Sequence, residues 1–163
     1  MGESIIKAGS RIMVMRYNSL SGVDFVKAHN NVTATKGACW MLKLGHKIPS
    51  SSLDQTIDAG GALILHTPKK EGDKYFLCRL LGHYQGNPTD EMKYPTYYEK
   101  IFQGDPQAKD GSWLRIGGIN QLNCDVARGL KLLKNNKPLY QALAETRTVV
   151  LYVYSDSEIV LAE

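Results

Sequence analysis

The chain alternates short apolar runs with polar segments that contain glycine and proline, and this pattern predicts strands separated by short helices. Each apolar run is bounded by turn-forming residues, as is typical of buried strands. The last run is rich in β-branched and aromatic residues, which favour a strand. The predicted strands cover residues 11–16, 39–44, 62–67, 75–82, 113–116 and 148–154.

Helical patterns are shorter and less regular than the strand patterns. They depend on apolar spacing, on capping residues and on glycines that end a helix. The predicted helices cover residues 23–30, a segment from Ser51 to the pair Gly60–Gly61, a segment from a cap at Asp125 that puts Val126, Leu130 and Leu133 on one face, and a last helix from Pro138 to Leu143.

Residues 83–112 form a long polar segment in which glycine and proline interrupt every period. The segment nevertheless contains the aromatic residues Tyr84, Tyr94, Tyr97, Tyr98 and Phe102. Disordered segments are poor in aromatic residues, and long loops in compact domains are usually functional. We therefore expect a functional loop here, although its tyrosines are as well explained by packing onto the rest of the domain.

Length and composition predict one α/β domain spanning residues 1–163, with its core at about 11–154. A chain of 163 residues that is 43% hydrophobic is sufficient for one sizeable core. No run approaches the roughly 18 apolar residues of a membrane span, and the start of the chain lacks the regions of a signal peptide. We expect an intracellular protein, cytoplasmic or nuclear, without a membrane partner.

Cysteine and charge exclude some classes of site. The three cysteines, Cys39, Cys78 and Cys124, are widely spaced without a Cys-x-x-Cys pair, so the sequence indicates neither a disulfide framework nor a zinc site. The net charge of +4 is compatible with a polyanionic partner. We expect no metal and no cofactor.

The order of these pieces resembles the YTH domain and its relative the EVE domain, small barrels of the PUA-like group. The resemblance covers residues 11–154, and it depends on the order in which these segments follow one another along the chain. They are Arg16-Tyr17-Asn18 at the end of the first strand, Lys36-Gly37-Ala38-Cys39-Trp40, the hairpin 62–67 to 75–81, the strand 113–116, and Asn135-Asn136-Lys137-Pro138-Leu139 followed by Arg147. The resemblance implies a small mixed β-barrel of about six strands flanked by helices.

YTH domains bind N6-methyladenine in RNA, and similar domains in methyl-directed restriction systems read modified bases in DNA. The resemblance therefore implies a module that binds methylated RNA or DNA and holds a flipped base in an aromatic cage. Trp40 would be the first wall, and Tyr98, with Tyr97 close behind, would replace the loop Trp that forms the second wall in the family. Asn18, beside Tyr17, would bind the base edge, and the Met41 carbonyl would accept from the methylamino group.

The chemistry of base capture is consistent with these residue types. Taking a base out of its stack costs a few kcal/mol, and stacking it on aromatic rings returns roughly 1 to 3 kcal/mol per base. An asparagine offers a donor and an acceptor to a base edge. Basic side chains would hold phosphates without reading sequence. The candidates are Arg16, Lys36, Lys131, Lys134, Lys137 and Arg147.

The sequence is also compatible with other interpretations. Trp40 is also explained as a core residue of a strand, and Trp113 is assigned to the core. A PUA-like RNA-binding module that uses shape and charge, without a modified-base cage, is the second candidate. A hydrolase that uses His66 and His83, which flank the predicted hairpin, is a third, although no phosphate-binding loop or nucleophile elbow supports an enzyme. An attached ATPase or nuclease domain is implied by the resemblance alone.

Overall fold

The computed structural model describes residues 3–17, 22–67 and 74–162. One large sheet contains most of the strands, and β2 and β4 run parallel in it while the other neighbours are antiparallel. Its order is β3 (Cys39–Lys43), β6 (Gly111–Ile116), β5 (Tyr75–Gly86), β4 (Ala62–His66), β2 (Ile12–Arg16), β9 (Val150–Tyr154) and β8 (Lys131–Leu132). Two short additions are β7 (Asn120–Gln121), which pairs with β5, and a separate pair of β1 (Glu3–Ile6) with β10 (Ile159–Ala162).

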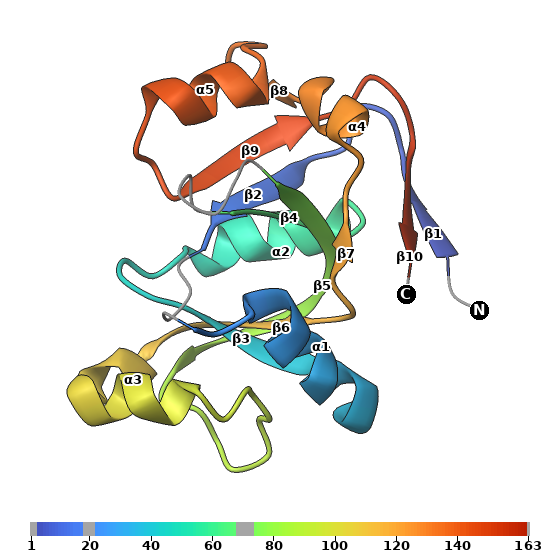
Figure 1. Ribbon diagram of the computed structural model, residues 1–163. Helices are drawn as coiled ribbons and strands as arrows, with labels where there is room; N and C mark the ends of the chain where they lie inside the picture. The colour runs from blue at the N-terminus through green and yellow to red at the C-terminus, as the bar shows by residue number, and fades with distance from the viewer. Residues whose placement is uncertain (1–2, 18–21, 68–73, 163) are drawn as a thin grey trace.

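Helices lie at both ends of this sheet. Figure 1 shows α4 and α5 beside β9 and β8, and α1 and α3 near β3 and β6 at the other end. The helices are α1 (Phe25–Lys36), α2 (Ser50–Asp58), α3 (Tyr98–Gly104), α4 (Cys124–Arg128) and α5 (Leu139–Glu145), with a 3-10 turn at Pro106–Lys109. Over the described part of the chain, no helix has the length and apolarity needed to cross a membrane.

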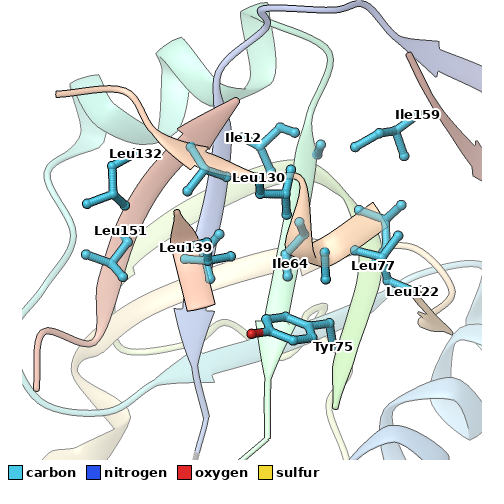
Figure 2. Close-up of a cluster of buried hydrophobic side chains, with 14 of the residues drawn as sticks. Ile12, Ile64, Tyr75, Leu77, Leu122, Leu130, Leu132, Leu139, Leu151 and Ile159 are labelled. Atoms are coloured by element: carbon cyan, nitrogen blue, oxygen red, sulfur yellow. The ribbon is translucent and has the colours of Figure 1, made fainter. Parts of the chain in front are cut away.

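The central strands β2 and β4 are apolar at every position before the last because they are buried on both faces. Successive residues of a strand point to opposite faces, so each strand contributes to two hydrophobic clusters. The outer core, part of which Figure 2 shows, includes buried residues of α4 and α5 and contains Ile12, Val14, Ala62, Ile64, Leu77, Leu151 and Val153. The inner core contains their neighbours Met13, Met15, Leu63, Leu65, Cys78 and Leu80.

The inner core is enclosed by a curved sheet that does not close. The strands β2, β3, β4, β5 and β6 all contribute to it, and Phe25 of α1 and Leu53 of α2 pack there. A register shift between Leu80 and Gly82 divides the long β5 into a part that pairs with β4 and a part that pairs with β6. Such a bulge bends a strand. In the described ranges no ladder joins β3 to β2, so the predicted closed barrel is wrong, whereas a mixed α/β class is confirmed.

The first helix is longer than its apolar pattern predicts. Asp24 caps α1 by accepting from the Lys27 N–H, and the helix ends at Gly37, whose φ of 85° is the left-handed C-cap conformation. The predicted end at Asn30 is wrong because the polar residues that follow continue the helix. Thr33 donates its hydroxyl proton to the His29 carbonyl, which satisfies that side chain within the helix.

The predicted helix behind Asp125 is wrong in its cap, its length and its face. Asn123 is the cap, and α4 ends at Arg128. Val126 and Leu133 are exposed, whereas Leu130 is buried. Residues after Gly129 instead form β8, which pairs with β9. The apolar spacing predicted a longer helix, but the pairing of β8 with β9 outweighed the local helical preference.

Other predicted boundaries shift by a few residues. The helix expected from Ser51 begins at Ser50 behind Pro49, without a side-chain cap. The segment 83–112 is not a loop throughout, because β5 continues to Gly86 and α3, the 3-10 turn and the start of β6 lie in the rest. The short strands β1, β7, β8 and β10 were not predicted, since strands of two to four residues carry almost no periodic signal.

We predict that Gly61→Ala destabilises the protein more than Gly37→Ala. Both glycines have positive φ, 75° and 85°, so alanine is strained at either position by about 1 to 2 kcal/mol. At Gly61 an added Cβ would also lie 2.8 Å from the Leu80 carbonyl oxygen, whereas at Gly37 it meets nothing within 4 Å. Urea denaturation measures the difference, and equal losses in the two variants would contradict the close approach of Gly61 to β5.

Candidate nucleic-acid interface

Trp40 lies on an edge strand and points away from the inner core. Along β3, Cys39 and Met41 pack into the inner core, while Trp40 and Leu42 pack against a third cluster on the opposite face. The Trp40 N–H donates to the Lys93 carbonyl at 2.9 Å, so the segment before α3 follows the free edge of β3. Trp40 is half-buried, which places it at the margin of this cluster.

The third cluster, which we call the α3 cluster, is mainly aromatic. Its buried members are Leu42, Met92, Tyr98, Phe102 and Trp113, and the half-buried Trp40, Tyr94, Tyr97, Ile101 and Ala108 pack against them. Tyr94 stacks on Tyr98 with 5.4 Å between ring centroids, and it lies 5.1 Å from the Trp113 ring. Trp113 is fully buried, as predicted. The chain thus brings Trp40 and the tyrosines of the 83–112 segment together.

Tyr98 lies inside the α3 cluster, with 2% of its surface exposed. Its hydroxyl accepts from the Leu42 N–H at 3.1 Å and lies 2.6 Å from His29 Nε2. Because the Phe25 carbonyl beside His29 Nδ1 can only accept, Nδ1 carries the ring proton and Tyr98 donates to Nε2. The buried hydroxyl therefore joins α3 to β3 and α1, and the Tyr98 ring does not face solvent.

His29 is a buried neutral histidine. Its ring lies 4.0 Å from the Phe25 ring and 5.6 Å from the Tyr98 ring. Loss of hydration lowers the pKa of His29 from 6.5 to about 4, against an opposing contribution from the hydrogen bond to Phe25. The imidazole consequently stays uncharged at neutral pH and acts as a structural link between α1 and α3.

Tyr94 and Tyr97 also line an open groove, which we call the tyrosine groove. It runs between residues 94–97 and helix α1 with its N-terminal approach, and its volume is about 550 Å³. From the helix side it is lined by Asp24, Lys27, Asn31 and Thr35. A groove with aromatic, amide and ammonium groups offers the three contacts that an unpaired nucleotide uses: stacking, base-edge hydrogen bonds and phosphate pairing.

Lys27 and Asn31 are groove residues that the sequence did not single out. Their spacing of four residues places them on one face of a helix. That signal was present in the sequence, but nothing in it showed that this face of α1 lies opposite Tyr94 and Tyr97. The relation depends on the contact of α1 with β3 and on the course of the segment before α3.

Tyr17 and Met41, which were also predicted to bind the base, lie on the far side of β3 from Trp40. Tyr17 is buried and stacks on Phe25 at 4.2 Å. The Met41 side chain is fully buried. Since Trp40 and Leu42 direct their N–H groups away from β6, strand alternation directs the backbone groups of Met41 toward β6. A cavity of about 50 Å³ beside Tyr17 and Met41 has room for a water molecule or two rather than a base. Asn18 lies outside the described residues.

Half of the predicted phosphate-binding residues have partners within the protein. Arg16 donates to the carbonyls of Leu143 and Thr146 at the C-terminal end of α5, at 2.5 and 2.6 Å. Lys131 pairs with Asp156 at 2.7 Å, and Lys137 pairs with Glu145. Lys36, Lys134 and Arg147 are exposed. The six residues therefore do not form one patch, because they are distributed over α1, β2 and the region from β8 to β9.

The histidines proposed for a hydrolase are not brought together. His66 ends β4 opposite Tyr75, at one end of β5, whereas His83 is in the distant half of β5 and lies 2.7 Å from Asp54. Within the described ranges no group of three or more His, Cys, Asp or Glu side chains is placed to hold a metal ion.

Comparisons with models of protein families, with curated proteins and with solved structures found no match for this chain. The YTH-like and PUA-like assignments accordingly stay predictions.

We predict that folding stability falls by about 2 kcal/mol more between pH 7 and pH 5 in the native protein than in His29→Gln. The folded protein resists protonation of His29 until about pH 4, whereas the unfolded chain binds this proton near pH 6.5. The stability that the neutral His29 contributes is therefore present above pH 6.5 and is lost as the pH falls toward 4. Urea denaturation at the two pH values measures it, and parallel losses in both proteins would contradict a buried neutral His29.

Proposed function

We propose that this chain is a nucleic-acid-binding module that takes an unpaired base of a single strand into the tyrosine groove beside Trp40. The observation that carries the proposal is the position of Trp40, Tyr94 and Tyr97. All three are half-buried and pack on the α3 cluster, which fixes their rings while part of each stays accessible. Rigid, partly exposed aromatic rings are the usual platform for an unpaired base.

The polar residues of the groove suit the rest of a nucleotide. Asn31 has the donor and acceptor needed to bind a base edge, and Lys27 supplies a positive charge for a phosphate. Asp24 lies in the same groove, so the anionic part of the ligand belongs on the Lys27 side. Lys36 at the end of α1 extends the positive charge along the helix.

N6-methyladenine is the base that we propose for this groove. The methyl group adds only about 0.8 kcal/mol through burial, so selectivity also requires close contact with the aromatic rings. In this proposal Tyr97 and Trp40 supply those contacts, and Tyr98 supports them from within the cluster. The base-edge contacts proposed for Asn18 and Met41 are replaced by Asn31, which lies in the groove.

A PUA-like RNA-binding module without modification specificity is the second candidate function. Burial of Tyr98 favours it, because the cage expected from Trp40 and Tyr98 lacks its second wall on the surface. The two functions share the groove and differ in whether the methyl group changes affinity.

Binding of labelled single-stranded oligonucleotides, measured by fluorescence polarisation, tests the proposal. RNA and DNA of matched sequence, with and without one N6-methyladenine, are titrated with the native protein, Trp40→Ala and Asn31→Ala. Tyr140→Ala is the matched control, because Tyr140 is an exposed aromatic residue on α5. Loss of one stacking contact weakens binding by roughly five- to 150-fold.

We expect the native protein to prefer the methylated strand, Trp40→Ala and Asn31→Ala to bind more weakly, and Tyr140→Ala to bind as the native protein does. Equal affinity for methylated and unmethylated strands, with Trp40→Ala and Asn31→Ala still impaired, would establish the second candidate instead. Native affinity in Trp40→Ala and Asn31→Ala would overturn both.

A further inference from the structure

A second cavity, separate from the tyrosine groove, lies between α5, the turn after β8 and the edge of β9. Its volume is about 470 Å³, within the range of small-molecule sites. We call it the α5 cavity. The residues that line it include Arg11, Leu132, Lys134, Ala142, Leu151 and Tyr152.

The cavity exists because β8 covers only part of β9. The strand β8 contains two residues, and its last contact with β9 is the Leu133 N–H to the Tyr152 carbonyl at 3.0 Å. The chain then turns back at Asn136, whose positive φ of 63° is stabilised by a hydrogen bond from the Tyr154 hydroxyl to its side chain. Beyond this turn the start of β9 is not covered by β8.

The floor of the cavity is apolar and rigid. Leu132, Ala142 and Leu151 line it and are also members of the outer core shown in Figure 2, which labels Leu132 and Leu151. Side chains held in a packed core change position little. An apolar floor of this kind favours a ligand with a flat or apolar body.

Arg11 lines the same cavity and is held in place by Tyr152. Its guanidinium lies 3.9 Å from the centre of the Tyr152 ring, in a cation–π contact that fixes its plane. Its Nε is buried and has no hydrogen-bond partner among the residues that the structure describes. The guanidinium carries five N–H donors, so Arg11 can offer its other N–H groups to an acceptor in the cavity that it lines.

The charges around the cavity favour an anion. Arg11 and Lys134 contribute positive charge, while Lys137 and Glu145 pair with each other and approximately cancel. The C-terminal end of α5 would repel an anion through its carbonyl groups, but Arg16 donates to the carbonyls of Leu143 and Thr146 at that end. The negative end of the helix is thereby neutralised.

We infer that the α5 cavity binds an organic phosphate with a flat body, of the size of a mononucleotide. The phosphate accepts from Arg11 and Lys134, and the flat body lies on the floor formed by Leu132, Ala142 and Leu151. The same chemistry is offered by a free nucleotide and by the phosphorylated end of a strand. This site goes beyond the proposed function, because none of its residues lies in the tyrosine groove.

Isothermal titration calorimetry with AMP, adenosine and inorganic phosphate tests the inference on the full chain. We expect AMP to bind at least tenfold more tightly than adenosine or phosphate alone, because each of these lacks half of the contacts. Arg11→Gln and Lys134→Gln are each expected to weaken AMP binding at least tenfold. Lys134 is exposed, so its variant tests the site even if Arg11→Gln fails to fold. Arg128→Gln, an exposed arginine of α4, is the control and should bind as the native protein does.

Two further measurements distinguish a free nucleotide from a phosphorylated strand end, and the α5 cavity from the tyrosine groove. A 5′-phosphorylated trinucleotide that competes with AMP would assign the site to strand ends, and failure to compete would assign it to free nucleotides. Trp40→Ala should retain AMP binding whether or not the proposed function is correct. Absence of AMP binding, native AMP affinity in Lys134→Gln, or loss of AMP binding in Trp40→Ala would each overturn the inference.

Discussion

Burial of the central strands on both faces is the constraint on which the rest of the structure depends. In β2 and β4 each residue before the last enters either the outer or the inner core, and both sets are almost completely excluded from solvent. A sheet with two apolar faces needs a cover on each. On the outer side α4, α5 and the β1–β10 pair supply it, and on the inner side the sheet curves around the core with α1 and α2.

The candidate interface arises where this cover is incomplete. The outer face of β3 and β6 is covered by α3, a helix of seven residues, together with the segment before it. A cover of this size buries Trp113 and Phe102 fully but leaves Trp40 and Tyr97 half-exposed. The hydroxyl of Tyr98 joins this small cover to β3 and to α1, so the exposed aromatic rings stand on a rigid support.

Positive charge is used differently at the two ends of the molecule. Near α5, Arg16 satisfies helix carbonyls, and Arg11 stacks on Tyr152, so arginines there are part of the structure and also shape a cavity. The ion pairs Lys131–Asp156 and Lys137–Glu145 lie at the surface, where such pairs contribute little to stability. Lys27 and Lys36 of α1 are exposed. Among the described hydrogen bonds, Lys27 takes part only through its backbone N–H, at the helix cap.

Local pattern determined much of this protein. The apolar runs at β2, β3, β4, β5, β6 and β9, the burial of Trp113 and the helix behind Pro138 follow from the sequence, because burial on both faces and proline geometry leave direct marks on residue type. Tertiary structure alone decided that β8 replaces the end of a predicted helix, that the sheet curves without closing, and that Tyr98 is buried while Lys27 and Asn31 face a groove. Those outcomes depend on contacts between residues far apart in the chain, and the pattern of a single segment carries no record of its partners.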